Sequence, residues 1–324
     1  MKISALKTLF HQHLSPLYDK REIDAVFYIY IEYKYNIEKH HYFLNPNLDI
    51  KFEEADLKAL AEGTPIQYIT GKTTFCNLEL NVNPAVLIPR QETEELVEMI
   101  LKHYRVRACS GSTQPKSPSN FEGVSRVARR GSLYKILDLC TGSGAIAIAL
   151  AKNIENAEVW ATDISEEALE IAKKNAEQNN VNITFFQHDI LDKDVSINDF
   201  NNKGHKVHTN GHKDNLLLNK TLLDIIVANP PYIPESERNQ LHKNVVNYEP
   251  HNALFVPDEN PLIFYEAIAD TAKKILREGG VLYFETHEKF HLELSAMLAE
   301  KGFKEIELWN DMNGKPRFAS GKKL

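Results

Sequence analysis

The chain has 324 residues, which is enough for two domains or one large one, and its 43% hydrophobic and 26% charged residues are typical of globular proteins. Its net charge of −7 argues against a protein whose main role is to coat nucleic acid. The three cysteines are scattered and odd in number, so we expect no disulfide framework and a reducing, cytoplasmic setting. No apolar run has the length of a membrane span or resembles a signal peptide, so we expect no membrane partner.

The first 70 residues predict a small helical domain. Apolar residues recur at helical spacing over residues 3–10, Asp19 can cap a second helix that runs to about residue 37, and residues 52–60 predict a third. The second of these segments is rich in aromatic residues, and no catalytic spacing occurs in any of them. We therefore interpret residues 1–70 as a helical bundle, with a docking surface for a macromolecular substrate as the alternative.

A linker follows the helical segment. Residues 63–71 lie between two glycines and predict a loop, and the alternation over residues 73–82 predicts a β-hairpin. We therefore assign residues 71–91 to a hairpin linker, followed by a helix from about Thr93 to residue 104. Arg90 lies just before that helix beside several carboxylates, a setting that by itself favours a surface ion pair.

Two stretches differ in composition from their surroundings. Residues 105–132 are rich in Ser, Gly, Pro and Arg and predict a flexible insertion, with a basic arm that touches RNA or an acidic partner as the alternative. Residues 193–220 predict a second polar insertion. It carries His205, His208 and His212, whose spacing matches no closed set of metal ligands, so we predict no metal site.

Strands and helices alternate from residue 135 to the C-terminus. Strands are predicted at residues 136–139, 157–162, 183–187, 222–228 and 281–285, the last after a turn at Gly279-Gly280, with closing strands near residues 306–309 and 317–319. Helices are predicted at residues 145–153, 165–178, 261–277 and 291–301. Because such alternation requires crossover connections, we expect an α/β domain over residues 92–324, with a mostly parallel sheet and helices on both faces.

A turn of small residues, Cys140-Thr141-Gly142-Ser143-Gly144, connects the first of these strands to its helix. Glycines allow a ligand to approach the backbone, but the pattern has Ala147 where a dinucleotide fingerprint has glycine, and it lacks the lysine of a phosphate loop. Asp163 ends the next strand, where a carboxylate can bind a ribose diol, and Asp189-Ile190 ends the third, where an acceptor beside an apolar side chain can hold adenine. This pattern favours S-adenosylmethionine over NAD; the alternative is that these aspartates only cap helices or end strands.

The run Asn229-Pro230-Pro231-Tyr232 follows a β-branched, apolar stretch that predicts a buried strand. The prolines must end the strand, so an amide side chain, the free carbonyl of Pro230 and an aromatic ring are held close together. This set suits a planar NH₂ group, because two acceptors can bind its two protons while a ring packs on its face. The alternative is an ordinary strand-to-loop turn.

Seven runs occur together in one order along the chain: Pro65-Ile66-Gln67-Tyr68-Ile69-Thr70-Gly71, Leu87-Ile88-Pro89-Arg90-Gln91-Glu92-Thr93-Glu94, residues 138–144, Asp163-Ile164-Ser165, residues 229–232, Glu249-Pro250 with Ala253-Leu254, and residues 311–317. With these runs the chain resembles the HemK/PrmC family, the peptide-chain-release-factor glutamine N5-methyltransferases. The resemblance implies a class I, Rossmann-like methyltransferase fold with a seven-stranded sheet and an N-terminal helical docking domain. It also implies S-adenosylmethionine as cofactor and, as partner and substrate, the Gly-Gly-Gln loop of class I release factors.

The resemblance also implies roles for particular residues. Asn229, Pro230, Pro231 and Tyr232 would form the catalytic set. The cofactor would contact Cys140, Thr141, Gly142, Ser143, Gly144, Asp163, Asp189, Ile190, Asn229 and Arg90. The sequence departs from the family pattern at Cys140, usually glycine, at Gln91, often proline, and over residues 256–262.

Other functions remain open from the sequence. One alternative is an amino-methyltransferase that acts on a ribosomal-protein glutamine or on adenine N6 of RNA or DNA, and another is a cofactor-binding module without catalysis. The acidic charge weighs against a stable nucleic-acid partner, and we expect a monomer.

Overall fold

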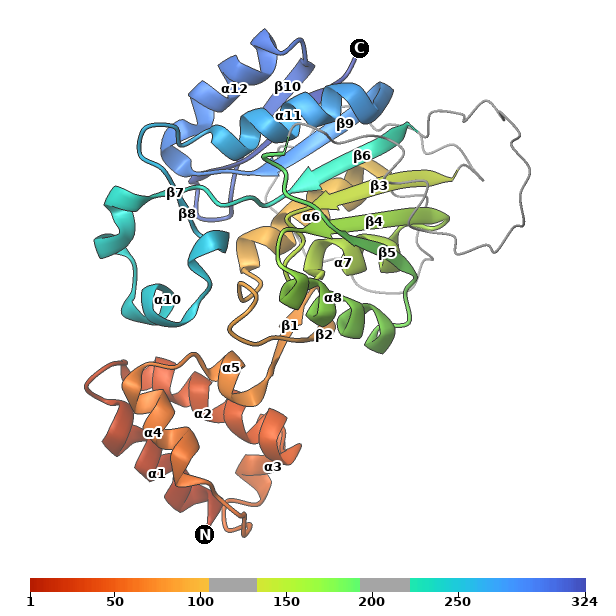
Figure 1. Cartoon of the computed structure of the whole chain (residues 1–324). Helices are drawn as coiled ribbons and strands as arrows, with labels where there is room; N and C mark the ends of the chain where they lie inside the picture. The colour runs from red at the N-terminus through yellow and green to blue at the C-terminus, as the bar shows by residue number, and fades with distance from the viewer. Residues whose placement is uncertain (105–132, 193–221) are drawn as a thin grey trace.

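The computed structural model describes residues 1–104, 133–192 and 222–324, so both predicted insertions lie outside the described residues. Figure 1 shows a group of N-terminal helices at one end, a short β-hairpin in the middle and a larger α/β part at the other end. The elements follow the predicted order, with strand–helix alternation only after the hairpin.

The N-terminal helices enclose a hydrophobic core of their own, which contains residues between Ile3 and Ile69 and none from the sheet. Asp19 begins the second helix in a capping box, because its side chain accepts the backbone N–H of Glu22 at 2.9 Å while Glu22 accepts that of Asp19. The helices are α1 (Ile3–Leu14), α2 (Lys20–Tyr35), α3 (Lys39–Leu44), α4 (Glu54–Glu62) and α5 (Ile66–Thr70).

The predicted loop over residues 63–71 is wrong, because this stretch contains the short helix α5. Its two glycines end helices instead of bounding a loop: Gly63 closes α4 at φ 97° and Gly71 closes α5 at φ 72°. Both lie in the left-handed region that glycine adopts without steric cost.

The predicted hairpin is confirmed as β1 (Lys72–Phe75) paired antiparallel with β2 (Leu78–Asn81). Cys76 and Asn77 form its two-residue turn, with φ of 48° and 61°. Two consecutive positive φ angles match the right-handed twist of the strands, which is why this turn connects them tightly.

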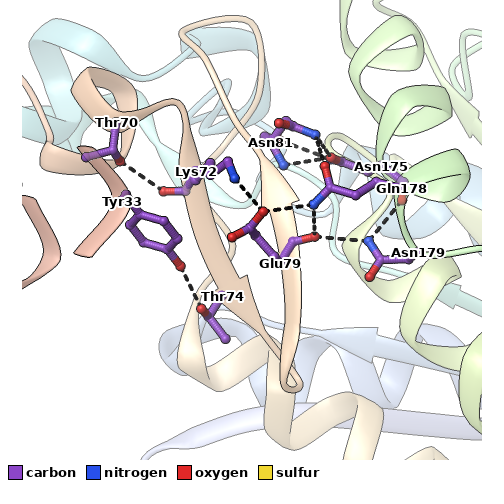
Figure 2. A network of polar contacts seen from close by, with 9 residues as sticks. All are labelled: Tyr33, Thr70, Lys72, Thr74, Glu79, Asn81, Asn175, Gln178 and Asn179. Carbon is purple, nitrogen blue, oxygen red and sulfur yellow. Dashed lines mark hydrogen bonds and ion pairs between the residues drawn. The ribbon is translucent and has the colours of Figure 1, made fainter. Parts of the chain in front are cut away.

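A polar network joins the hairpin to α8 (Glu166–Gln178) of the α/β part, as Figure 2 shows. Its centre is the fully buried Asn175, whose Oδ1 accepts from the backbone N–H of Asn81 at 2.6 Å and from the Asn81 side chain at 2.9 Å. The Asn175 Nδ2 donates to the carbonyl of Asn81 at 3.0 Å and to that of Ser143 at 2.9 Å. On the other side of the hairpin, Tyr33 of α2 hydrogen-bonds Thr74 at 2.8 Å, so the hairpin is held by both parts of the molecule.

The sheet of the α/β part has seven strands in the order β10-β11-β9-β6-β3-β4-β5, which confirms the mostly parallel sheet. Among the described strands of this sheet, β11 is antiparallel to both β10 and β9, and the other neighbouring pairs are parallel. The strands are β3 (Tyr134–Leu139), β4 (Ala157–Asp163), β5 (Ile183–Gln187), β6 (Leu223–Ala228), β9 (Leu276–Glu285), β10 (Lys304–Asn310) and β11 (Pro316–Lys322). The strand order reverses beside β3, because β4 and β5 lie on one side of it and β6 and β9 on the other, and ligands bind at such switch points.

Helices bury both faces of the sheet. Ile136 of β3 contributes to the core under α6 (Gln91–Tyr104), α7 (Ala145–Asn153) and α8, whereas its neighbour Leu137 points to the core under α11 (Ile263–Ile275) and α12 (His291–Glu300). This alternation explains why β3 is apolar almost throughout.

The predicted turn at Gly279-Gly280 is wrong, because both glycines lie inside β9, which begins at Leu276. The pairing of β9 with β6 shifts register between Leu223 and Ile225, and Gly279 has φ of 77°. The glycines therefore accommodate a bulge in a continuous strand.

The segment between β6 and α11 is the remaining part of the described fold. It contains the two-stranded pair β7 (Ile233–Pro234) and β8 (Phe255–Val256), the helix α10 (Lys243–Tyr248), and two short 3₁₀ turns, η1 (Glu235–Gln240) and η2 (His251–Ala253). A third turn, η3 (Glu288–Phe290), precedes α12. Tyr248 donates to the carbonyl of Glu62 at 3.1 Å, and Asn244 hydrogen-bonds Tyr18, so this segment touches the N-terminal helices.

Candidate active site

A cavity of about 280 Å³ opens at the carboxyl ends of β3, β4, β5 and β6, beside the point where the strand order reverses. It brings together side chains from segments that are far apart in the sequence. Its lining includes Pro89, Arg90, Thr93, Cys140, Thr141, Gly142, Ser143, Thr162, Asp163, Ile164, His188, Asp189, Ile190, Asn229, Pro231, Asn252, Ala253, Phe255 and Phe264. Most of the predicted site residues are therefore found around one space.

Asp163 fixes the small-residue turn from the end of the neighbouring strand. Its Oδ2 accepts the backbone N–H of Gly142 at 2.8 Å, and its Oδ1 accepts that of Ser165 at 2.9 Å, where α8 begins. Asp163 therefore also caps the start of α8, which is the alternative role that the sequence analysis considered for it. A carboxylate can accept about four hydrogen bonds, so capacity remains for a ligand in the cavity.

The glycine at 144 has a packing role. Gly144 is the one residue of the turn that does not line this cavity, and a Cβ there would lie 3.1 Å from the Cβ of Ala172 and from Cδ1 of Ile148. Its φ of 82° adds a second reason for glycine. Gly144 therefore allows α7 to approach α8 closely.

Cys140 stands where the family usually has glycine, and its φ of 60° is in the left-handed region. Burial raises the pKa of its thiol well above the usual value, and the nearby carboxylates of Asp163, Asp138 and Asp189 raise it further. The side chain at the cavity wall is therefore an uncharged thiol.

Asp138 lies beneath the turn and is completely buried. Its Oδ2 accepts from the hydroxyl of Thr141 at 2.5 Å and from the backbone N–H of Ala147 at 3.1 Å, while none of the described residues hydrogen-bonds its Oδ1. Burial raises the pKa of Asp138 to about 7, against the effect of these two hydrogen bonds.

This raised pKa gives the stability a pH dependence that we predict to be measurable. The folded state keeps a proton on Asp138 up to about pH 7, whereas the unfolded chain loses it near the ordinary value of 3.8, so stability falls as pH rises between these values. In Asp138→Asn the neutral side chain keeps an acceptor for Thr141 and Ala147. We expect the unfolding free energy of the wild type, relative to Asp138→Asn, to decrease by about 2 kcal/mol from pH 5 to pH 7. Urea unfolding of both proteins at several pH values measures this difference, and parallel pH profiles would contradict it.

Asn229 directly follows β6 at the cavity, and its side-chain amide is hydrogen-bonded to a residue of α6. Its Nδ2 donates to the hydroxyl of Thr93 at 3.2 Å, and Thr93 in turn donates to Oε2 of Glu285 at 2.7 Å. The hydroxyl of Tyr232 donates to Oε1 of the same carboxylate at 3.1 Å. Of the four predicted catalytic residues, Asn229 and Pro231 line the cavity, whereas Pro230 and Tyr232 do not.

Arg90 also lines the cavity, and the simple surface ion pair expected for it is wrong. Its guanidinium meets Glu249 at 2.6 Å, and the side chain of Glu249 is only 2% exposed. The second oxygen of Glu249 accepts the backbone N–H of Ile88 at 3.3 Å. This pair therefore joins the segment before α6 to the segment after α10 across the cavity rim.

Glu249, Thr93 and Glu285 are polar residues at this site to which the sequence analysis gave no role. Glu285 carried a detectable signal, because it is a carboxylate at the carboxyl end of an apolar strand, the position that identified Asp163 and Asp189. Thr93 and Glu249 were part of the runs that carry the family resemblance, but nothing in their local sequence indicated a partner.

In the part of the chain that the structure describes, no group of three or more His, Cys, Asp or Glu side chains could hold a metal ion. His205, His208 and His212 lie outside the described residues. None of the described helices is both long enough and apolar enough to span a bilayer.

Known proteins are similar to this chain over most of its length. The family described as "Methyltransferase domain" matches residues 130–320. A release factor glutamine methyltransferase from Flavobacterium psychrophilum is 38% identical over 322 residues, which cover 98% of each chain. A protein of the same name from Bacteroides thetaiotaomicron is 38% identical over 264 residues, 82% of this chain and 78% of that protein.

Among solved structures, the catalytic domain of hMettl16 in complex with the MAT2A 3′UTR hairpin 6 is similar with a TM-score of 0.50, at 16% identity over 92% of each chain. At this identity the similarity supports the fold alone, the class I methyltransferase fold with its mostly parallel sheet. The sequence relatives go further and confirm the resemblance found in the sequence: the chain belongs to the family of release factor glutamine methyltransferases.

Proposed function

We propose that the protein transfers a methyl group from S-adenosylmethionine to the side-chain amide nitrogen of the glutamine in the Gly-Gly-Gln loop of a peptide chain release factor. The observation that carries the proposal is the position of Asn229, whose amide lies at the wall of a cavity that also contains the predicted nucleoside-binding carboxylates. The names of the sequence relatives point to the same reaction.

The groups that line the cavity fit S-adenosylmethionine, which supplies an electrophilic methyl group when bound. Asp163 would accept hydrogen bonds from the ribose hydroxyls, and Asp189 with Ile190 would hold the adenine. The backbone of the turn over residues 140–143 would lie against the amino-acid end. Two carboxylates, apolar side chains and a turn without a lysine suit a nucleoside that carries no phosphate.

Asn229 and the backbone of Pro230 would position the glutamine. An amide nitrogen is a poor nucleophile, because its lone pair is delocalised into the carbonyl. Asn229 Oδ1 and the Pro230 carbonyl, to which no described residue donates a hydrogen bond, would each accept one N–H of the substrate. This aims the nitrogen at the methyl group and stabilises positive charge on it as the N–C bond forms and the bond between the methyl group and sulfur breaks. The methylated amide then loses one N–H proton to solvent. Pro231 would keep the turn rigid, and Tyr232 would support it through Glu285.

We further propose that residues 1–70 form a docking domain for the release factor, residues 71–91 a hairpin linker and residues 92–324 the methyltransferase domain. The separate core of the N-terminal helices supports this division. Two hydrogen bonds join these helices to the segment that carries α10 and the cavity-lining residues Asn252 and Phe255, which supports a docking surface beside the active site.

A methyl-transfer assay tests the proposed reaction. The purified protein is incubated with methyl-labelled S-adenosylmethionine and a release factor, beside a copy of that factor whose Gly-Gly-Gln glutamine is replaced by alanine. We expect label in the first factor and none in the second. Label in ribosomal protein, RNA or DNA instead would assign a different amino substrate, and cofactor binding with no transfer to any of these would indicate a binding module.

A further inference from the structure

We propose that Thr93 and Glu285 form a hydrogen-bond relay that fixes the orientation of the Asn229 amide, so that its oxygen and not its NH₂ group faces the substrate. Both are positioning residues, since they would act through Asn229. The inference rests on the proposed function for its catalytic consequence, but the relay itself is a property of these three side chains.

The relay joins three elements that are distant in sequence. Thr93 lies in the first turn of α6, Asn229 directly follows β6, and Glu285 is the last residue of β9. The two hydrogen bonds measure 3.2 Å and 2.7 Å. Thr93 is 4% exposed and Glu285 is 1% exposed, so water is largely excluded as a substitute partner.

The direction of the relay follows from which atoms carry hydrogen. Thr93 donates its single hydroxyl proton to Oε2 of Glu285 at 2.7 Å. The Thr93 oxygen can then only accept a hydrogen bond, and the Asn229 group that faces it must be the NH₂. The Oδ1 of Asn229 is consequently left as an acceptor toward the cavity.

The opposite orientation of the amide would lose the hydrogen bond to Thr93 and the hydrogen bond to the substrate. Oδ1 would face the Thr93 oxygen with no hydrogen between them, and the NH₂ of Asn229 would face the NH₂ of a substrate amide. An amide side chain has nearly the same shape in both orientations, so packing alone does not select one. The hydrogen bond from Thr93 to Glu285 selects the orientation in which Oδ1 of Asn229 faces the cavity.

The surroundings of Glu285 act on its ionisation in both directions. Burial raises the pKa of Glu285, and Glu92 raises it further, while the hydrogen bonds from Thr93 and Tyr232 and the charge of Arg317 lower it. Arg317 itself forms an ion pair with Asp311 at 3.7 Å. Burial dominates, so the pKa of Glu285 is raised overall, while the two hydrogen bonds and the guanidinium act toward the ionised carboxylate, whose two oxygens are both acceptors.

The test compares Thr93→Val, which removes the hydroxyl but keeps the shape, with Thr93→Ser, which keeps the hydroxyl. We expect Thr93→Val to lower kcat for methyl transfer about tenfold, the effect of losing one orienting hydrogen bond, with cofactor affinity unchanged. Thr93→Ser should restore most of that loss. Thr8→Val, in α1, controls for the same substitution away from the site, and thermal unfolding shows whether each variant is folded.

A second measurement does not depend on activity. In protein labelled with ¹⁵N-asparagine, the side-chain NH₂ signals of Asn229, assigned by their absence in Asn229→Ala, report exchange of its protons with water. We expect slow exchange in the wild type and Thr93→Ser and faster exchange in Thr93→Val.

The relay is overturned if Thr93→Val leaves both kcat and this exchange unchanged, or if Thr93→Ser loses as much as Thr93→Val in both. A wild type that shows the protected NH₂ but methylates no release factor would refute the proposed function and leave the relay supported.

Discussion

Replacing Asn229 by alanine is expected to lower kcat for methyl transfer by about 10²- to 10³-fold, the loss found when one preorganised polar group at a reacting centre is removed. The variant keeps the rigid turn at Pro230 and Pro231, but only the Pro230 carbonyl remains to accept a substrate N–H. The nitrogen then loses its alignment with the methyl group, and positive charge developing on it loses one of two stabilising dipoles.

This result is measured as kcat and KM for methyl transfer to a release factor, with cofactor affinity determined by calorimetry. Cofactor affinity should fall far less than kcat, because Asn229 is one of several predicted cofactor contacts and the predicted ribose and adenine contacts lie at the ends of β4 and β5. Asn153→Ala is a matched control, since Asn153 is at the opposite end of α7 and its Nδ2 donates only to its own helix. Near-normal turnover by a folded Asn229→Ala protein would refute the proposed role of Asn229.

Replacing Asn175 by leucine is expected to destabilise the fold by about 3 to 6 kcal/mol, because one buried and two partly buried backbone groups would lose their partner at about 1 to 2 kcal/mol each. These groups are the N–H and carbonyl of Asn81 and the carbonyl of Ser143. Leucine has a similar volume, so the loss reports the missing hydrogen bonds and not a cavity. The same change loosens the cofactor turn, because Ser143 belongs to it.

Urea unfolding measures the loss for Asn175→Leu. Asn179→Leu is the control: Asn179 also bonds the hairpin, through the carbonyl of Glu79 at 3.0 Å, but it is only partly buried and water can replace it. We expect the control to lose less than about 1 kcal/mol. Equal losses in the two variants would show that Asn175 has no special place in the network that Figure 2 displays.

Most elements were predictable because the signals that form them act within a few residues. The Ala- and Ile-rich run over residues 145–153 is α7 with the predicted bounds, and residues 183–187 are β5. The predictions failed where glycines were read as turns. Gly63 and Gly71 end helices, and Gly279 lies in a bulge of β9, so the same residue type met two different backbone needs.

By itself, the sequence determined three features through local signals. Periodicity determined the strand–helix alternation, glycines the small-residue turn over residues 140–144, and prolines the position of the amide of Asn229 at the end of a strand. Only the tertiary structure decided what these groups contact. Thr93 and Glu285 are 192 residues apart, and Asn81 and Asn175 are 94 apart, yet both pairs are hydrogen-bonded. Thr93 and Glu285 meet because the order of strands in the sheet brings the end of β9 beside α6, and Asn81 and Asn175 meet because the hairpin packs against α8. Nothing in the residues next to each partner encodes these arrangements.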